Sequence, residues 1–122
     1  HKRRIDNDKP SILFGLASFA EGLDLPGRYC EHVIIQKIPF VVPSDPIEKT
    51  RTLWLEANQL NPFMLSMLPQ ASTRLTQYVG RLLRRQDDTG QVTILDQRLV
   101  SKYYGKQLLD NLPPFDIVIE KA

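Results

Sequence analysis

The chain has 122 residues, a length typical of one domain, with 42% hydrophobic and 25% charged residues. Its formal charge of +2 comes from 16 basic and 14 acidic side chains, so charge alone does not indicate a nucleic-acid-binding protein. Cys30 is the only cysteine and no apolar run reaches the ~18 residues of a membrane span, which excludes a disulfide framework, a cysteine-rich zinc or iron–sulfur site held by this chain, and a transmembrane helix.

The chain begins HKRRIDNDKP, with neither an initiator methionine nor a secretory pattern. We therefore expect residues 1–122 to be one domain cut from a longer protein. The lone cysteine favours a reducing setting, and we expect a cytoplasmic location with no membrane contact.

The first elements predict a strand, a loop and a second strand. Ser11 to Phe19 is a short apolar run bounded by Pro10 and by turn residues, as in a buried strand. Residues 20–29 form a loop with carboxylates at Glu21 and Asp24 and glycines at 22 and 27. His32 to Phe40 is predicted as a strand covered on both faces, because Val33, Ile34 and Ile35 are continuous.

A helix is predicted from Asp45 to about Asn58. Asp45, Pro46 and Glu48 resemble an N-cap, a first-turn proline and a capping-box partner. Its apolar side would carry Ile47, Trp54 and Ala57, with Trp54 in the core. Residues 61–68 are predicted to be irregular, with apolar side chains available to a neighbouring domain.

The central helix is predicted from Pro69 to Arg85. An apolar stripe would be buried, and it consists of Ala71, Leu75, Tyr78, Val79 and Leu82. Gln77, Arg81 and Arg84, spaced i, i+4 and i+7, fall on the opposite face. A glycine inside a helix costs about 1 kcal/mol relative to alanine. We therefore interpret the presence of Gly80 as a sign that a backbone segment or a ligand comes close to the helix at this position.

The remaining residues predict one more strand and a last helix. Gln91 to Asp96 reads as a strand, and Ser101 would cap a helix carrying Tyr104, Leu108 and Leu112. Asp96 and Arg98 are interpreted as a tie between strand and helix rather than as a catalytic pair. Residues 117–120 would add an edge strand or trail off. Strands alternating with helices indicate an α/β fold with a mostly parallel sheet flanked by helices.

Guanidinium groups on one helix face suit phosphate oxygens, and two aimed arginines could stabilise a phosphoryl group that develops charge. The loop of residues 19–27 reads F-x-E-G-x-D-x-x-G and follows the first strand. Ligands of α/β folds bind in the crevice beyond the carboxyl ends of strands, so loop and helix could serve one site.

Together these segments resemble a known family. Gln77, Gly80, Arg81 and Arg84 match the Q-x-x-G-R-x-x-R signature of superfamily 2 helicases. With the F-x-E-G-x-D-x-x-G loop, DxRL at residues 96–99 and YGKQLLDNLPPF near the end, residues 9–115 resemble the C-terminal motor domain of DinG-type helicases, in the iron–sulfur group that includes the XPD proteins, and especially the YoaA branch.

The resemblance implies a RecA-like fold, with Arg84 and Arg81 as arginine fingers and Gln77 as a nucleotide sensor. Glu21, Gly22 and Asp24 would couple the nucleotide to DNA and to the partner domain. No phosphate-binding loop is present in the sequence, so ATP and Mg²⁺ would be bound mainly by the preceding N-terminal motor domain of the same protein. That domain could also carry an iron–sulfur cluster. No metal is assigned to this chain.

The implied partners are single-stranded DNA and forked or duplex DNA, with a replicative polymerase accessory subunit as a further possibility. Two alternatives remain open at this point. One is a non-hydrolysing nucleic-acid-binding domain that kept the fold, and the other is a protein-interaction module that docks through residues 63–68 and 104–115.

Overall fold

The computed structural model describes residues 1–16, 24–40, 46–80 and 89–120. Within them two strands and several helices follow one another, with η1 a 3₁₀ turn and η2 a π-helical turn. In chain order the elements are α1 (Lys2–Asp6), η1 (Gly27–Tyr29), β1 (His32–Ile35), α3 (Pro46–Ala57), η2 (Phe63–Met67), α4 (Leu68–Val79), β2 (Gln91–Ile94), α5 (Arg98–Ser101) and α6 (Gly105–Asp110).

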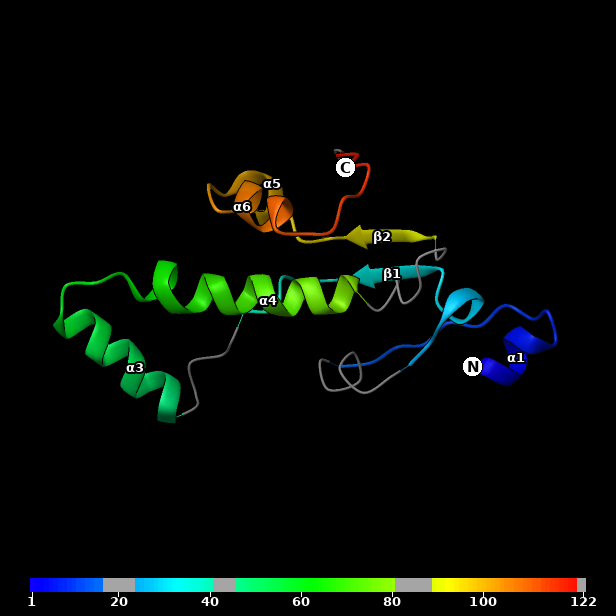
Figure 1. Ribbon diagram of the computed structural model, residues 1–122, viewed down its shortest axis with the longest axis horizontal. Coiled ribbons are helices and arrows are strands. Elements are labelled where there is room, and N and C mark those ends of the chain that lie inside the picture. Colours follow the sequence, from blue (N-terminus) through cyan, green and yellow to red (C-terminus); the bar gives the residue numbers. More distant parts are fainter. Residues whose placement is uncertain (17–23, 41–45, 81–88, 121–122) are drawn as a thin grey trace.

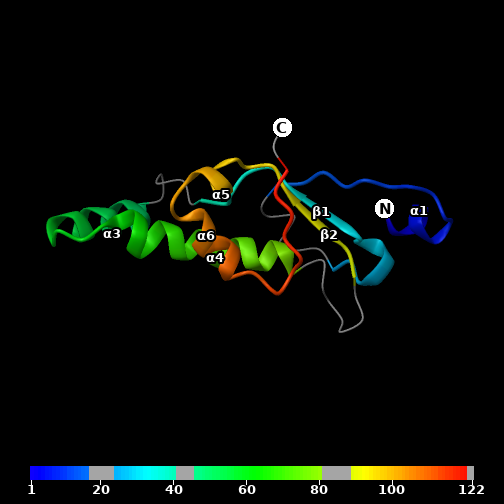
Figure 2. The same ribbon diagram turned by 90° about the horizontal axis from the view of Figure 1, so that it is seen from above.

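The two strands form a parallel pair, as predicted. His32 lies opposite Gln91 and Ile35 opposite Ile94, and the backbone N–H of Leu95 donates to the Ile35 carbonyl oxygen at 2.9 Å. The strands point toward α4, α5 and α6, with α5 and α6 beyond the tip of β2 (Figure 1). Figure 2 shows the same grouping from above, with α1 and α3 at opposite ends of the molecule. An α/β arrangement with parallel strands and flanking helices is thus confirmed, while the RecA-like fold stays a prediction.

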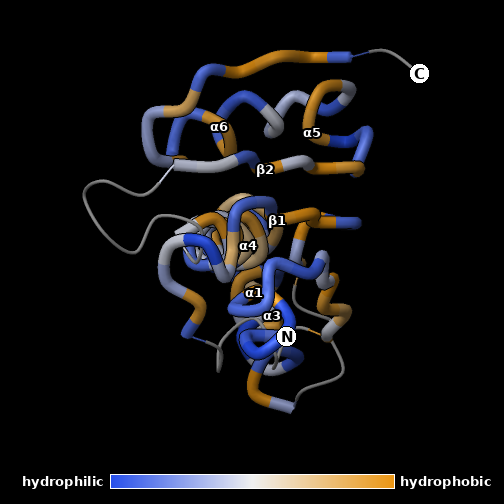
Figure 3. Tube along the Cα trace, turned by 90° about the vertical axis from the view of Figure 1, so that its right-hand side faces the viewer, coloured by the Kyte–Doolittle hydropathy of each residue, from blue (hydrophilic) through white to orange (hydrophobic). Residues whose placement is uncertain are grey.

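The hydrophobic core lies at the carboxyl end of β1, between the strands and the helices α4, α5 and α6. Ile35 and Ile38 form one buried cluster there with Leu68, Ala71, Leu75 and Val79 of α4, Leu99 of α5, Tyr104 at the start of α6, and Leu108 of α6. Figure 3 shows hydrophobic stretches of α4 and β1 near the middle of the end-on view. The predicted stripe of α4 is confirmed over its described residues, since Ala71, Leu75 and Val79 are fully buried and Tyr78 is half-buried. Leu82 lies outside the described residues.

The predicted first strand is wrong over Ser11–Leu16. No strand is present there, and Ile12, Phe14 and Leu16 are exposed. An extended apolar segment becomes a strand only when a neighbouring strand accepts its backbone hydrogen bonds, and these residues have no such partner in the described part of the chain. The rest of the predicted strand lies outside the described residues.

The second strand is shorter than predicted and is covered on one face only. Ile35 is buried, whereas Ile34 is 62% exposed. Successive side chains point to opposite faces of a strand, so a continuous apolar run does not by itself show that both faces are covered.

The helix α3 has the predicted extent, but its buried side was predicted wrongly. Leu55 is its buried residue, while Trp54, Ile47 and Ala57 are exposed, and Trp54 is 61% exposed rather than in the core. The helix ends in a left-handed turn: Gln59 has φ 57°, and the Leu60 N–H donates to the Leu55 carbonyl oxygen at 2.9 Å. The predicted N-cap, Asp45, lies outside the described residues.

The predicted irregular stretch before α4 is also wrong, because η2 joins α4 without a break. The Asn61 side-chain oxygen accepts the Phe63 N–H at 3.0 Å, and Pro62 stands at the start of the turn. An Asn–Pro pair of this kind is a helix-start signal that the apolar content of the segment obscured.

The last helical region is split into α5 and α6, with Ser101 at the end of α5 and not at the predicted N-cap. Tyr104 and Leu108 are buried as predicted. A Cβ on Gly105 would lie 1.9 Å from the Leu99 carbonyl oxygen, so only glycine lets the two helices approach this closely. Residues 117–120 form no strand and are exposed.

Among helices of the described ranges, none has the length and apolar character needed to cross a membrane.

Candidate functional site

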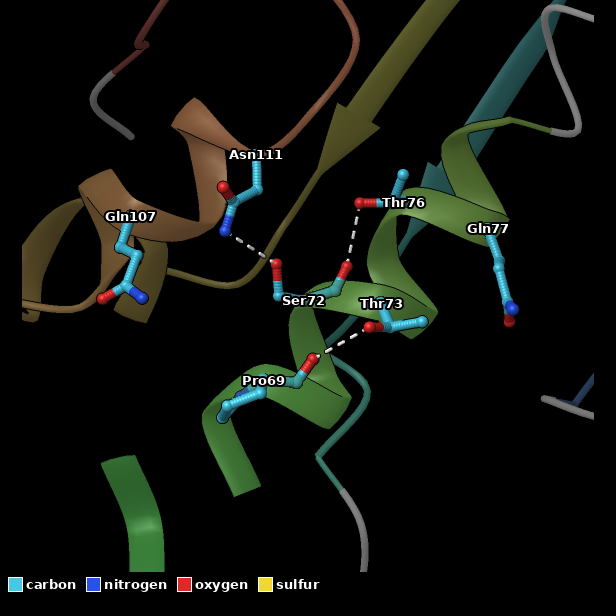
Figure 4. Close-up of a pocket in the computed structure, with 7 residues that line it drawn as sticks. All are labelled: Pro69, Ser72, Thr73, Thr76, Gln77, Gln107 and Asn111. Atoms are coloured by element: carbon cyan, nitrogen blue, oxygen red, sulfur yellow. Dashed lines mark hydrogen bonds between the residues drawn. The ribbon is translucent and has the colours of Figure 1, made fainter. Parts of the chain in front are cut away.

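Gln77 lies on the side of α4 that faces away from the core, as predicted. Its side chain is exposed, whereas Leu75 and Val79 are fully buried. It lines a hollow of about 470 Å³ between α4 and α6 (Figure 4). The hollow, here called the α4–α6 groove, is lined by Pro69, Ser72, Thr73, Thr76, Gln77, Gln107 and Asn111.

Internal hydrogen bonds already satisfy part of this lining. Asn111 Nδ2 donates to Ser72 Oγ at 3.1 Å and thereby joins α6 to α4. Thr73 and Thr76 donate to carbonyl oxygens one turn earlier on α4, at 3.1 and 2.9 Å. The carboxamide of Gln77 has no hydrogen-bond partner among the described residues, so it can donate to and accept from a polar ligand.

The α4–α6 groove has no formal charge among its lining residues. It can therefore orient a polar group, whereas neutralising a phosphate would require cations from elsewhere. The sequence places Arg81 and Arg84 immediately after α4, but both lie outside the described residues, so their predicted convergence with Gln77 remains a prediction.

The predicted loop site is described only at its end. Asp24 is exposed and precedes η1, where Gly27 has φ 58°. That left-handed conformation favours glycine and explains Gly27 without a ligand. Glu21 and Gly22 lie outside the described residues.

Gly80 ends α4 in a right-handed helical conformation, with φ −63° and ψ −14°. Its N–H donates to the Thr76 carbonyl oxygen at 2.9 Å, and an added Cβ would lie 3.2 Å from that oxygen. The backbone conformation itself thus does not require glycine. The close approach of a ligand at Gly80 stays a prediction.

Asp96 and Arg98 form the predicted tie between β2 and α5. Arg98 Nη2 donates to Asp96 Oδ2 at 2.6 Å, and Nε donates to Asp96 Oδ1 at 3.0 Å. Asp96 Oδ2 also accepts the backbone N–H of Ile38 at 2.9 Å, which brings in the segment after β1. We call these three residues the strand-end clamp.

The hydrogen bonds of the strand-end clamp favour the charged carboxylate. Those from Arg98, and secondarily that from the Ile38 N–H, lower the pKa of Asp96 from 3.8 to about 2. The Arg98 guanidinium also lies 5.2 Å from the centre of the Phe40 ring, a cation–π contact. The clamp therefore ties β2, α5 and the segment after β1 together, and the predicted tie is confirmed.

The α4–α6 groove itself was missed in the sequence, although a signal exists. Ser72, Thr73 and Thr76 occupy polar positions of α4 between the stripe residues, and Gln107 of α6 is followed at i+4 by Asn111, which caps the end of that helix. Each pattern predicts a polar helix face. The two faces meet where Leu108 of α6 and the buried residues of α4 join one hydrophobic cluster, and no local pattern specifies that cluster.

Comparison with known proteins finds helicases among the relatives of this chain. A helicase C-terminal domain family matches residues 1–115. The ATP-dependent DNA helicase DinG of Photobacterium profundum is 52% identical over 120 residues, covering 98% of this chain and 17% of that protein. DinG of Escherichia coli (strain K12) is 47% identical and that of Salmonella typhimurium is 44% identical, each over 117 residues. The chain spans 16–17% of the length of these curated relatives.

Proposed function

This chain belongs to the helicase C-terminal domain family, with DinG-type helicases among its relatives, and we propose that it is the second motor domain of an ATP-dependent DNA helicase. In this proposal the parent protein couples ATP hydrolysis to movement along single-stranded DNA and to duplex unwinding, in DNA repair or replication. The observation that carries it is the exposed position of Gln77 on α4, opposite the buried stripe, at the start of the Q-x-x-G-R-x-x-R sequence.

The proposed catalytic residues are Arg84 and Arg81, with Arg84 as the main arginine finger. Their i+4 and i+7 spacing from Gln77 would carry them along the same side if the helix direction were kept beyond Gly80. An arginine finger stabilises the charge that develops on the transferred phosphoryl group. Gln77, with its open carboxamide, would hydrogen-bond to the nucleotide or to the water near it.

The chain's own residues fit only part of the nucleotide site. Gln77 offers one polar group, and no three metal-ligating side chains converge anywhere in residues 1–16, 24–40, 46–80 and 89–120. We therefore assign Mg²⁺, the main ATP contacts and any iron–sulfur cluster to the preceding motor domain. When bound there, Mg²⁺ supplies charge neutralisation at the phosphates.

The proposed coupling residues are Glu21, Gly22 and Asp24. Carboxylates of a loop beyond a strand could bind a ribose hydroxyl or the arginines, and glycine permits a close backbone approach. Phosphate contacts by backbone and loop ends explain how a chain of net charge +2 could contribute to DNA binding.

The test replaces Arg84 with alanine in the full-length protein. We expect ATP binding to be retained while DNA-stimulated ATP hydrolysis falls about 10³-fold or more, by analogy with other arginine fingers. The matched control is Arg85→Ala, an adjacent arginine outside the signature, which should keep most of the turnover. Near-normal hydrolysis by Arg84→Ala would remove the proposed role.

A second candidate function is a protein-interaction module, and it could coexist with the motor. One observation favours it: Trp54 of α3 and Leu65 of η2 are 61% and 55% exposed, and both line a hollow of about 460 Å³. A replicative polymerase accessory subunit would be one such partner. Capture of that subunit by the isolated chain without nucleotide, and loss of capture with Leu65→Ser, would support docking.

A further inference from the structure

Tyr103, in the linker between α5 and α6, is unusually exposed for a residue in an aromatic cluster. This residue is 73% exposed, whereas the adjacent Tyr104 is 8% exposed. Tyr104 packs against Phe40 and Phe63, with ring centres 5.8 and 5.0 Å away. The cluster is thus buried on its inner side and presents one large aromatic ring to solvent.

The Tyr103 ring is also held in place. It contacts Tyr104 edge to face, with ring centres 5.4 Å apart and an angle of 80° between the planes. Its hydroxyl donates to the sulfur of Met64 at 3.7 Å, across to η2. A ring fixed at its rim but open over most of its surface is preorganised for stacking.

Two unpaired cations lie near Tyr103 in the sequence. Lys102 precedes it and Lys106 follows on α6; both are exposed, and neither forms an ion pair within the described ranges. The Asp96 carboxylate accepts hydrogen bonds from Arg98 and from the Ile38 N–H, and neither lysine pairs with it. Asp110, one turn after Lys106, is the nearest carboxylate along α6, and no ion pair joins it to Lys106.

We propose that Tyr103, together with Lys102 and Lys106, forms a binding site for single-stranded nucleic acid, in which one base stacks on the ring and the lysines contact flanking phosphates. The ring explains the choice of a single strand, because a base in a duplex is already covered by its neighbours. The positive charges of Lys102 and Lys106 complement a phosphate backbone. This inference rests on the proposed function for the nature of the partner and assigns it a new contact.

The site lies in the linker between α5 and α6, two helices that lie beyond the tip of β2 (Figure 1). The strand-end clamp fixes Arg98 and hence the start of α5, and Gly105 allows α6 to fold back onto Leu99. The short linker that carries Tyr103 is therefore anchored at both of its ends.

The test measures binding of the full-length protein to a fluorescein-labelled oligothymidine by anisotropy, without nucleotide. Tyr103→Ala should weaken binding at least ~5-fold, the effect of losing one stacked base, whereas Tyr103→Phe should bind within about twofold of the wild type. Lys102→Gln with Lys106→Gln should reduce the slope of log K against log salt by about 0.7 for each lost phosphate contact. Lys49→Gln, an exposed lysine on α3, is the matched control and should leave the slope unchanged.

Unchanged affinity in Tyr103→Ala, or an equal loss for blunt duplex and for single strand, would overturn the stacking site. If the Tyr103→Ala protein also unfolds more easily, the variant with Lys102→Gln and Lys106→Gln becomes the deciding test, because it removes charge only from exposed positions. An unchanged slope of log K against log salt in that variant then overturns the site. A wild-type protein that neither binds the oligonucleotide nor hydrolyses ATP would instead refute the proposed function.

Discussion

Replacing Asp96 with asparagine tests the strand-end clamp most directly. The substitution keeps the size of the side chain and an oxygen for the Ile38 N–H, but it removes the charge that binds Arg98. The Asp96 side chain is 7% exposed and that of Arg98 is 41% exposed. Solvent therefore screens the charge of Arg98 and weakens the ion pair.

The magnitude follows from the pKa of Asp96, which is about 2 in the folded chain against 3.8 as its ordinary value. At 1.36 kcal/mol per pKa unit this difference corresponds to about 2.4 kcal/mol, and screening at Arg98 reduces the expected loss to about 1–2 kcal/mol. Because the folded pKa is the lower one, the contribution is fully present above pH ~4 and is lost as the pH falls toward 2.

The assay is urea unfolding of the chain followed by far-ultraviolet circular dichroism at pH 7, 4, 3 and 2. The free energy of unfolding of Asp96→Asn should lie below that of the wild type at pH 7, and the gap should close toward pH 2. Asp110→Asn, an exposed carboxylate of α6, is the control and should show no gap. A gap of the same size at pH 7 and pH 2, or none at pH 7, would refute the reasoning.

Further predictions concern packing and use the same unfolding assay. Gly105→Ala should destabilise by about 2 kcal/mol or more, because the new Cβ, 1.9 Å from the Leu99 carbonyl oxygen, would have to push it out to a normal contact distance; a neutral result would contradict the close approach. Leu75→Ala should cost about 2–5 kcal/mol because Leu75 is fully buried in α4, while Thr73→Ala on its exposed side should cost less than about 1 kcal/mol. Trp54→Ser should change stability by only about 0.5 kcal/mol, since its side chain is 61% exposed; a loss typical of a core tryptophan would show that the side chain is buried.

The sequence was most informative where one local pattern determines both the element and its buried face. The apolar spacing of α4 predicts its helix and its buried residues, and the same spacing places Gln77 on the opposite side. The parallel pairing of β1 and β2 also follows from the sequence, because the long helical connection between them leaves a parallel arrangement as the natural one.

The failures share a physical cause. Apolar side chains at Ile12, Phe14 and Trp54 indicate surface that gains free energy when covered, but not which segment covers it. A strand additionally needs a partner for its backbone groups, and a helix needs a neighbour on its apolar side. Periodicity therefore predicts elements such as α3 correctly and still misassigns their contacts, as it did for Trp54.

The position of Gln77 links the stability of the fold to the proposed chemistry. Since 3.6 residues complete a helical turn, the burial of Leu75 and Val79 fixes the rotation of α4 about its axis, and this rotation fixes the direction of Gln77. A substitution that rotated the helix by one residue to bury a different stripe would turn Gln77 by about 100° and carry the following residues with it. The buried stripe is thus itself part of the proposed site, because it sets where a side chain on the opposite face of the same helix can reach.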